Sequence, residues 1–167
     1  YPICADFDGD NKADPAIFQK QECKWLVLSS KDNYIQQPFS LSLLELLEDD
    51  SNNLIAFAKD FDGDSKADAS IYSPNTGSWQ IMASSMDYKI IKLTNFLGSI
   101  EEKLAAADYD GDRKTDFATF TASSGKWKVR FSSANYALYE FSSVSEPDSF
   151  PIPFDYDNDM KEDPALY

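Results

Sequence analysis

Four short segments of the chain carry aspartates at the same positions. They read DFDGDNKAD (6–14), DFDGDSKAD (60–68), DYDGDRKTD (108–116) and DYDNDMKED (155–163). With the first Asp as position 1, the aspartates stand at positions 1, 3, 5 and 9 of every segment. Alternate carboxylates in a tight turn converge on one point, and such an all-oxygen cage suits calcium, which binds about 6–8 oxygens. Each segment is therefore predicted to be a calcium-binding loop.

The other loop positions refine this prediction. Position 7 is Lys in all four loops, and because a Lys side chain cannot ligate a cation, we expect its backbone carbonyl to do so. Position 4 is Gly in three loops, which lets the backbone fold around the ion, but the fourth loop has Asn158 there. We expect three to four Ca²⁺ ions, with the fourth site the least supported. The expected ligands are the side chains of Asp6, Asp8, Asp10, Asp14, Asp60, Asp62, Asp64, Asp68, Asp108, Asp110, Asp112, Asp116, Asp155, Asp157, Asp159 and Asp163, and the backbone carbonyls of Lys12, Lys66, Lys114 and Lys161.

Other metal and catalytic chemistries fit the chain less well. An EF-hand needs a bidentate Glu at position 12, where these loops have Ile, Ile, Thr and Leu. Magnesium prefers strict octahedral geometry with several waters. The chain has no His and two Cys, which disfavours zinc and copper sites. The lack of His also excludes a Ser-His-Asp triad and any mechanism with a histidine base.

Further markers repeat in step with the loops. The loops are spaced by 54, 48 and 47 residues. Trp25, Trp79 and Trp127 each follow the first Asp of their loop by 19 residues, and Tyr34, Tyr88 and Tyr136 each follow their Trp by nine. The fourth copy stops at residue 167, before any Trp. The chain therefore holds three full cassettes and the opening part of a fourth.

Within a cassette, the pattern indicates β-strands. A short apolar stretch precedes each loop, a second run follows it, and a turn rich in Gly, Asn, Pro and Ser leads to a third run that alternates apolar and polar residues. Four short strands in about 40–50 residues match the size of a β-propeller blade. We expect an all-β, propeller-like array of four-stranded antiparallel blades in a single repeat domain. Its blades cover about 1–53, 54–102 and 103–149, with a partial blade at 150–167.

Three details accompany this prediction. The segment 41–48 (LSLLELLE) has the pattern of one short helix between the first two blades, or alternatively of an apolar outer strand that runs into an acidic turn. The recurrent Trp and Tyr residues are expected to pack between blades, since each aromatic side chain buries about 150–250 Å². Exposed copies would instead favour a carbohydrate-stacking surface. Cys4 and Cys23 are compatible with one disulfide in an oxidising compartment or with two inert buried thiols.

The composition limits the classes of partner that the protein is expected to bind. The formal net charge is −14, and 16 of the 29 acidic residues lie in the four loops. Nucleic acid is not an expected partner, because phosphate neutralisation needs a basic surface. No stretch approaches the roughly 18 apolar residues of a membrane helix, so membrane insertion is not expected either.

At this point the residues support a resemblance. The unit 60–68, followed by Ile71-Tyr72 and by Gly77-Ser78-Trp79, resembles the FG-GAP/VCBS class of calcium-binding repeats. That class includes the blades of integrin α-subunit propellers and bacterial secreted repeat proteins. The resemblance covers nearly the whole chain and implies a β-propeller, calcium in each loop, and an extracellular, secreted or cell-surface location. The literal FG and GAP tripeptides are absent, and position 6 holds Asn, Ser, Arg and Met where many members have a second Gly.

The function expected on this basis is that of a non-enzymatic, calcium-stabilised recognition or adhesion module, lectin-like in that it binds glycan or protein on a propeller face. The alternative is an accessory propeller domain or fragment of a larger secreted polysaccharide-active enzyme. The sequence marks no catalytic residues and no ligand-binding residues. Since three and a half cassettes do not obviously make a ring, we also expect self-association or a further segment that completes the propeller.

Overall fold

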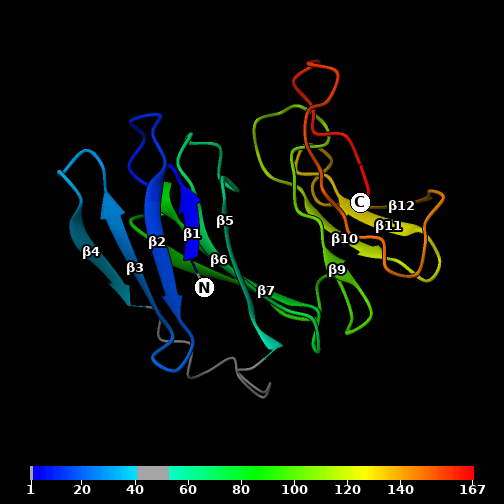
Figure 1. Ribbon diagram of the computed structural model, residues 1–167, viewed down its shortest axis with the longest axis horizontal. Coiled ribbons are helices and arrows are strands. Elements are labelled where there is room, and N and C mark those ends of the chain that lie inside the picture. The colour runs from blue at the N-terminus through cyan, green and yellow to red at the C-terminus, as the bar shows by residue number, and fades with distance from the viewer. Residues whose placement is uncertain (1, 41–52) are drawn as a thin grey trace.

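The computed structural model describes residues 2–40 and 53–167, and within them the protein is all-β, as predicted (Figure 1). Three four-stranded antiparallel sheets follow one another along the chain, each with its strands in sequence order. The described residues form no α-helix and one 3-10 turn, η3 (Ser84–Met86). None of their helices is long and apolar enough to cross a membrane. The segment 41–48, for which a short helix or an outer strand is predicted, lies outside the described residues.

Each sheet is one blade of the predicted array. Blade 1 consists of β1 (Pro2–Ala5), β2 (Asp14–Gln19), β3 (Lys24–Ser29) and β4 (Ile35–Ser40). Blade 2 consists of β5 (Ile55–Lys59), β6 (Asp68–Ser73), β7 (Ser78–Ala83) and β8 (Lys89–Leu93). Blade 3 consists of β9 (Lys103–Leu104), β10 (Phe117–Thr121), β11 (Lys126–Arg130) and β12 (Leu138–Ser142).

The residues from 150 to 167, called cassette 4 here, begin a fourth sheet. Two antiparallel bridges, between Pro151 and Leu166 and between Phe154 and Asp163, repeat the pairing that opens each blade. Blades 1 and 2 lie on one side of Figure 1, and blade 3 and cassette 4 on the other. The described chain thus forms an arc of blades, and the structure shows no closed ring.

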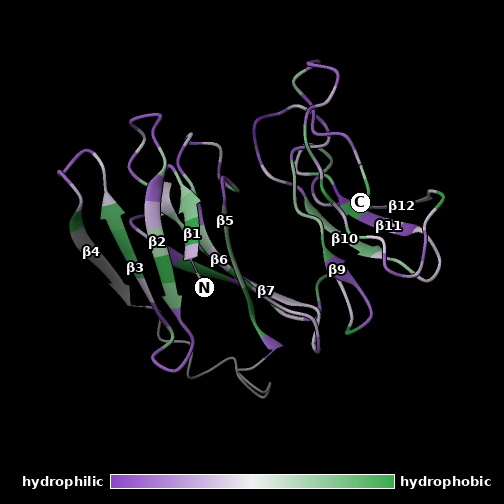
Figure 2. Cartoon of the chain, viewed as in Figure 1, coloured by the Kyte–Doolittle hydropathy of each residue, from purple (hydrophilic) through white to green (hydrophobic). Residues whose placement is uncertain are grey.

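The alternation of apolar and polar residues explains why these segments form strands. In β2 every second side chain is buried, and β3 follows the same period from Trp25 to Ser29. The apolar residues gather on the strands, while the loops at the top of the view are hydrophilic (Figure 2). Because the side-chain period of a strand is two, this pattern fixes which face of each sheet is buried.

The core lies between the blades, and the recurrent Trp residues are its centre. Trp25, Trp79 and Trp127 are at most 1% exposed. One apolar cluster joins blades 1 and 2, a second joins blades 2 and 3, and a third joins blade 3 to cassette 4. The prediction that the tryptophans pack between blades is therefore confirmed.

Two of the three recurrent Tyr residues pack between blades, as predicted, and all three also occupy a left-handed turn. Tyr34, Tyr88 and Tyr136 all have positive φ, between 57° and 62°, in the turn between the third and fourth strands. Tyr88 packs on the cluster between blades 1 and 2, and Tyr136 contacts Phe96, which follows β8 of blade 2, at 6.3 Å between ring centroids. Tyr34 is 56% exposed. These tyrosines thus belong to a left-handed turn, and they meet a neighbouring blade only where one precedes them.

The two cysteines are free thiols. Cys4 lies on β1, exposed to solvent, and Cys23 lies in the turn between β2 and β3, where its Sγ contacts the carbonyl of Lys20 at 3.4 Å. Cys4 pairs with Pro15 near the start of β2, whereas Cys23 follows the end of that strand. The register therefore separates them along and across the sheet, so the structure has free thiols, although neither is buried as the second alternative expects.

Candidate metal centres

Each acidic loop connects the first strand of a cassette to the second. In every copy, the residue just before the loop pairs with the Asp at position 9: Ala5 with Asp14, Lys59 with Asp68, Ala107 with Asp116, and Phe154 with Asp163. This antiparallel pair closes the loop like a hairpin. The first and last carboxylates are thereby brought to the same end of the sheet.

Carboxylate oxygens from three aspartates converge in each loop, within 4.8 Å of one another. In loops 2, 3 and 4 the converging aspartates come from positions 1, 3 and 9, whereas in loop 1 they come from positions 1, 3 and 5. The protein therefore has four aspartate triads that could hold metal ions. The triads are Asp6-Asp8-Asp10, Asp60-Asp62-Asp68, Asp108-Asp110-Asp116 and Asp155-Asp157-Asp163.

The position-1 aspartate shapes the loop. In loop 1, Asp6 accepts hydrogen bonds from the N–H groups of Gly9 at 2.6 Å and Asn11 at 2.7 Å. Asp60 and Asp108 accept the same two bonds in loops 2 and 3. The donors at positions 4 and 6 have positive φ in all four loops, including Arg113 at 71° and Met160 at 70°. The loop therefore imposes the left-handed conformation even on side chains that rarely adopt it.

The position-9 aspartate is the most buried part of each complete site. The Asp68 side chain is fully buried, and its two oxygens accept the N–H groups of Phe61 at 2.8 Å and Ser84 at 2.7 Å. Asp14 and Asp116 have the equivalent pair of donors and the same burial. Burial raises the pKa of Asp68 and of Asp116 to about 6, against the lowering effect of the N–H donors. A buried carboxylate of this kind favours a nearby cation.

The fourth site is less complete. Asp163 is half-buried and accepts the N–H of Tyr156 at 3.0 Å. In the three full blades, the second donor comes from the residue that follows the third strand, and cassette 4 ends before such a strand. Among the described residues, the position-9 aspartate of the fourth site thus accepts one backbone N–H, whereas each full site has two.

A serine-rich turn after the third strand completes each full site, and the sequence analysis missed it. Ser29 donates its hydroxyl to Asp8 at 2.5 Å, and Ser85 donates its hydroxyl to Asp62 at 2.7 Å. In loop 3, Ser133 donates to Asp110 at 2.6 Å. A signal was available, because Ser30, Ser84 and Ser132 each stand five residues after the repeated Trp and each donate a backbone N–H to the position-9 carboxylate.

The remaining predicted ligands are placed differently. Asp64, Asp112 and Asp159 at position 5 lie outside their triads, and each accepts the N–H of the Lys at position 7. In loop 1, Asp14 at position 9 is the aspartate outside the triad, and Lys12 Nζ forms an ion pair with Asp10 at 2.8 Å. The position-7 carbonyls remain predicted ligands.

The loops are joined to one another in a chain. The N–H at position 8 of each loop donates to the position-1 carbonyl of the preceding loop, from Ala67 to Asp6 at 2.7 Å, from Thr115 to Asp60 at 2.6 Å, and from Glu162 to Asp108 at 2.7 Å. The position-7 Lys lies over the Gly of the preceding loop, so that a β-carbon on Gly63 would lie 2.8 Å from Lys114 Cε. The Gly at position 4 thus leaves room for a flexible Lys side chain of the neighbouring loop and adopts the positive φ without strain.

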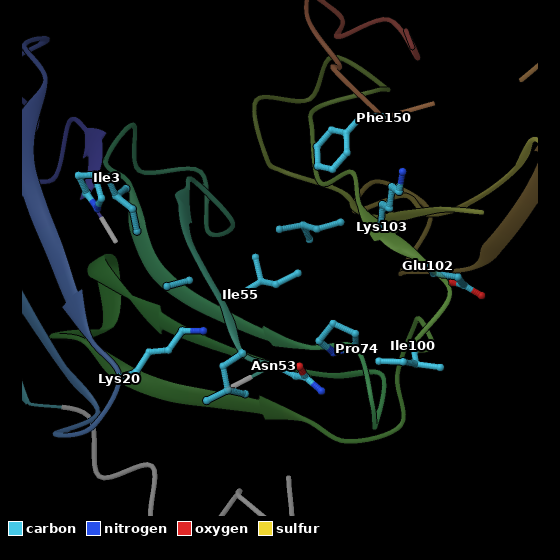
Figure 3. A pocket seen from close by; sticks show the side chains of 13 residues that line it. Ile3, Lys20, Asn53, Ile55, Pro74, Ile100, Glu102, Lys103 and Phe150 are labelled. Carbon is cyan, nitrogen blue, oxygen red and sulfur yellow. The ribbon is translucent and has the colours of Figure 1, made fainter. Parts of the chain in front are cut away.

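One pocket lies where the first strands of the blades face each other. It has a volume of about 660 Å³ and is lined by β1, β5 and β9 together with Phe150 at the start of cassette 4 (Figure 3). Its lining is mainly apolar, and its acidic side chain, Glu102, is held by Lys128 at 2.6 Å and Thr119 at 2.6 Å. Lys103 extends to the carbonyl of Ser149 at 2.8 Å. The first strands of three blades thus line one cavity.

No protein-family model matches the chain, and no curated protein is similar to it.

Proposed function

We propose that the protein is a calcium-stabilised extracellular recognition or adhesion module of the FG-GAP/VCBS type, which binds glycan or protein on a propeller face. The observation that supports this most is the convergence of three carboxylates in every one of four repeated loops. All the converging groups are oxygens, which are the ligands that calcium prefers. The donor set therefore fits calcium, and the residues that would hold it are the four triads.

Calcium has a structural role in this proposal. In each full blade, the triad gathers the loop between the first two strands, and the position-9 aspartate also holds the turn after the third strand. An ion at the triad therefore ties three strands of the blade together. At a free calcium concentration about ten times Kd, each site would add roughly 1.4 kcal/mol, and four would add roughly 5–6 kcal/mol. This is comparable to the net stability of a whole domain, about 5–15 kcal/mol.

The recognition role is supported by architecture. Loop-bearing edges held by a rigid β-scaffold are common positions for binding surfaces. In the pocket lined by β1, β5 and β9, the carboxylate of Glu102 is held by Lys128 and Thr119, so it is not free for acid–base chemistry. The proposal therefore assigns the chain no catalytic residue and places the ligand on an outer face of the array.

Calcium titration by calorimetry is the first test. We expect three to four sites, and a melting temperature that falls sharply when EDTA replaces calcium. Magnesium at the same concentration serves as the control and should restore little of the lost stability. An unchanged melting temperature after complete removal of calcium would contradict the proposal.

A glycan array, probed with the protein in calcium and again in EDTA, tests the recognition role. Calcium-dependent binding to a defined set of glycans supports it, as does calcium-dependent binding to a protein ligand in a parallel array. Release of sugars from a bound polysaccharide would contradict it and indicate an enzyme instead.

A further inference from the structure

The hydrogen bond that joins two successive acidic loops involves both of their candidate metal sites. Its acceptor is the carbonyl of the position-1 aspartate, whose carboxylate belongs to the preceding triad. Its donor is the N–H of position 8, which lies between the position-7 carbonyl, a predicted ligand, and the position-9 aspartate. The first two loops, which such a bond joins, lie side by side at the top of Figure 1. Each junction therefore connects the ligands of one loop to those of the next.

The donor N–H and the position-7 carbonyl belong to the same peptide group. Since a trans peptide group is planar, its N–H and its carbonyl point in opposite directions, and the described chain has no cis peptide bond. At the first junction, the Ala67 N–H donates to the Asp6 carbonyl at 2.7 Å, and this bond fixes the direction of the Lys66 carbonyl. The Thr115 N–H forms the same bond at the second junction, at 2.6 Å. The preceding loop thus orients a predicted ligand of the loop that follows it.

A second contact anchors the same peptide group. The Lys66 side chain lies over Gly9 and the Lys114 side chain lies over Gly63, where a β-carbon would be 3.0 and 2.8 Å from the Lys Cε. The Gly in turn donates its N–H to the position-1 carboxylate of its own loop, from Gly9 to Asp6 at 2.6 Å. A loop with an ordered position-1 aspartate therefore offers the next loop an acceptor for the N–H and a surface for the Lys.

The junction between loops 3 and 4 has an additional bond. Glu162, at position 8 of loop 4, donates its N–H to the Asp108 carbonyl at 2.7 Å, and its carboxylate accepts the Asp108 N–H at 2.8 Å. Ala67 and Thr115, at the same position of loops 2 and 3, have no carboxylate for this second bond. The backbone of Asp108 is thus held on both sides by loop 4. The site with one N–H donor fewer on its position-9 aspartate has this doubled link to its neighbour.

An ordered and a loosened acidic loop are the two states that a cation can bias. The three carboxylates of a triad lie within 4.8 Å of one another, so they repel when no cation lies between them. A cation that binds the ordered state more tightly shifts the loop towards it. Because the ordered loop also holds the peptide group of the next loop, binding at the first site reduces the ordering that binding at the second requires. By linkage, the effect acts equally in both directions.

We infer that the calcium sites are positively coupled from loop to loop, and that Glu162 is a positioning residue that makes the coupling between sites 3 and 4 the strongest. The inference rests on the proposed calcium binding and concerns how the sites affect one another. Since one junction bond has the free energy of a net hydrogen bond, each junction should change calcium affinity by about two- to tenfold. The coupling opposes the repulsion between two bound ions, which solvent and salt screen.

Asp110→Asn tests the coupling. Asp110 is the position-3 member of its triad and takes no part in the junction bonds, so the variant should lose site 3 and keep the wild-type circular dichroism spectrum. Calcium titration followed by NMR reports each loop separately through its position-6 amide, which donates to the position-1 carboxylate. Site 2 should bind calcium about two- to tenfold more weakly than in the wild type, and site 4 should weaken by a larger factor.

Asp8→Asn is the matched control. Asp8 is the position-3 member of the first triad, and its loop is joined to loop 2 but not to loop 4. This variant should lose site 1, weaken site 2 by the same two- to tenfold factor, and leave the affinity of site 4 as it is in the wild type. A loss at site 4 equal to that in Asp110→Asn would show a general loss of stability and would overturn the inference.

The sign of the change at site 4 separates the coupling from simple electrostatics. Loop 3 with its ion has four carboxylates and two added positive charges, whereas the Asp110→Asn loop has three carboxylates and no ion. The substituted loop is the more negative neighbour, so electrostatic attraction alone would tighten calcium binding at site 4. Unchanged or tighter binding there overturns the inference and leaves calcium binding itself intact. A wild-type protein that binds no calcium contradicts the proposed function, and the inference with it.

Substitutions of Glu162 test its role as a positioning residue. Glu162→Ala keeps the backbone bond to Asp108 and loses the carboxylate acceptor, so the factor by which Asp110→Asn weakens site 4 should fall to the factor measured at site 2. Glu162→Gln, whose amide oxygen can accept the Asp108 N–H, should retain the larger factor. The same large factor in the Glu162→Ala background would overturn the assignment of Glu162.

Discussion

The position-9 aspartate joins three parts of its blade. In blade 2, Asp68 receives one N–H from the start of its own loop, through Phe61, and one from the turn after the third strand, through Ser84. Its carboxylate also belongs to the triad. One side chain therefore orders a loop, holds a distant turn and contributes a candidate metal ligand.

Asp68→Asn should lower stability and remove one calcium site. The amide has one acceptor oxygen where the carboxylate has two, so one of the two N–H donors would face the amide NH₂ group. A buried donor without a partner costs about 1–3 kcal/mol. We expect a loss of that size in urea unfolding without calcium, and one site fewer in calorimetry.

Asp163→Asn is the matched control for this substitution. Asp163 is half-buried and accepts the Tyr156 N–H, so the amide oxygen can keep that bond. Its cost without calcium should stay within about 0.5 kcal/mol, as for other surface substitutions. Equal losses of unfolding free energy for Asp68→Asn and Asp163→Asn would show that burial and the second N–H donor do not determine the cost of the substitution.

The sequence predicts the aspartates of each site better than the arrangement around them. Alternating carboxylates in a tight turn account for the grouping of positions 1 and 3, whereas position 9 joins them in three loops because the first two strands pair beside it. The serine-rich turn lies about 16–23 residues from the aspartates that it contacts, and only strand pairing brings it there. The replacement of position 9 by position 5 in loop 1 has no marker in the sequence.

At the scale of elements, one Trp on the third strand of each blade packs between that blade and the next cassette. Trp79 contacts Phe117 of blade 3 at 5.0 Å between centroids, and its indole N–H donates to the carbonyl of Leu97 at 2.8 Å. Trp127 donates in the same way to the hydroxyl of Ser143 at 3.0 Å. The indole N–H of Trp25 has no partner among the described residues.

Trp79→Phe should therefore destabilise the protein more than Trp25→Phe. Both substitutions remove similar volume from a fully buried site, but only the first leaves a buried carbonyl without its donor. Since a net hydrogen bond contributes about 0.5–1.5 kcal/mol, we expect the two free energies of unfolding to differ by about 1 kcal/mol. Denaturant unfolding of both variants in calcium measures this. A larger loss for Trp25→Phe would contradict the assignment.

The strand pattern was predictable because a period of two and clear turn residues mark each strand. The turn after the third strand was not. Its tyrosines are predicted to pack between blades, and Tyr88 and Tyr136 do, but the sequence does not indicate that all three have positive φ, which is uncommon for an aromatic residue. A single sequence does not distinguish a Tyr that occupies a left-handed turn from a Tyr that only packs in the core.

At the scale of the whole molecule, Glu162 links three cassettes. Its carboxylate pairs with Lys59 of blade 2 at 3.1 Å and accepts the N–H of Asp108 in loop 3 at 2.8 Å. Because Lys59 and Glu162 are 103 residues apart, this contact holds cassette 4 to a distant part of the array.

Glu162→Ala should loosen cassette 4 selectively. Both partners of the ion pair are partly exposed, so the pair contributes at most about 1 kcal/mol, and the lost acceptor for Asp108 N–H adds a similar amount. We expect faster amide hydrogen exchange in cassette 4, with little change in β2 and β3. Glu140→Ala, which removes an exposed pair with Lys126, is the control and should leave exchange in cassette 4 unchanged. Uniformly faster exchange throughout the chain would argue against a local role.

The hydrogen bonds that link successive loops also affect how the number of cassettes in such a protein can change. Every junction uses the same donor and the same acceptor, at positions 8 and 1 of successive loops. An unequal crossover between two copies of the coding sequence, aligned on neighbouring loops, would remove or add one whole cassette and still recreate a junction of the same kind. An array that lost or gained one cassette in this way would therefore still have a matching donor and acceptor at every junction.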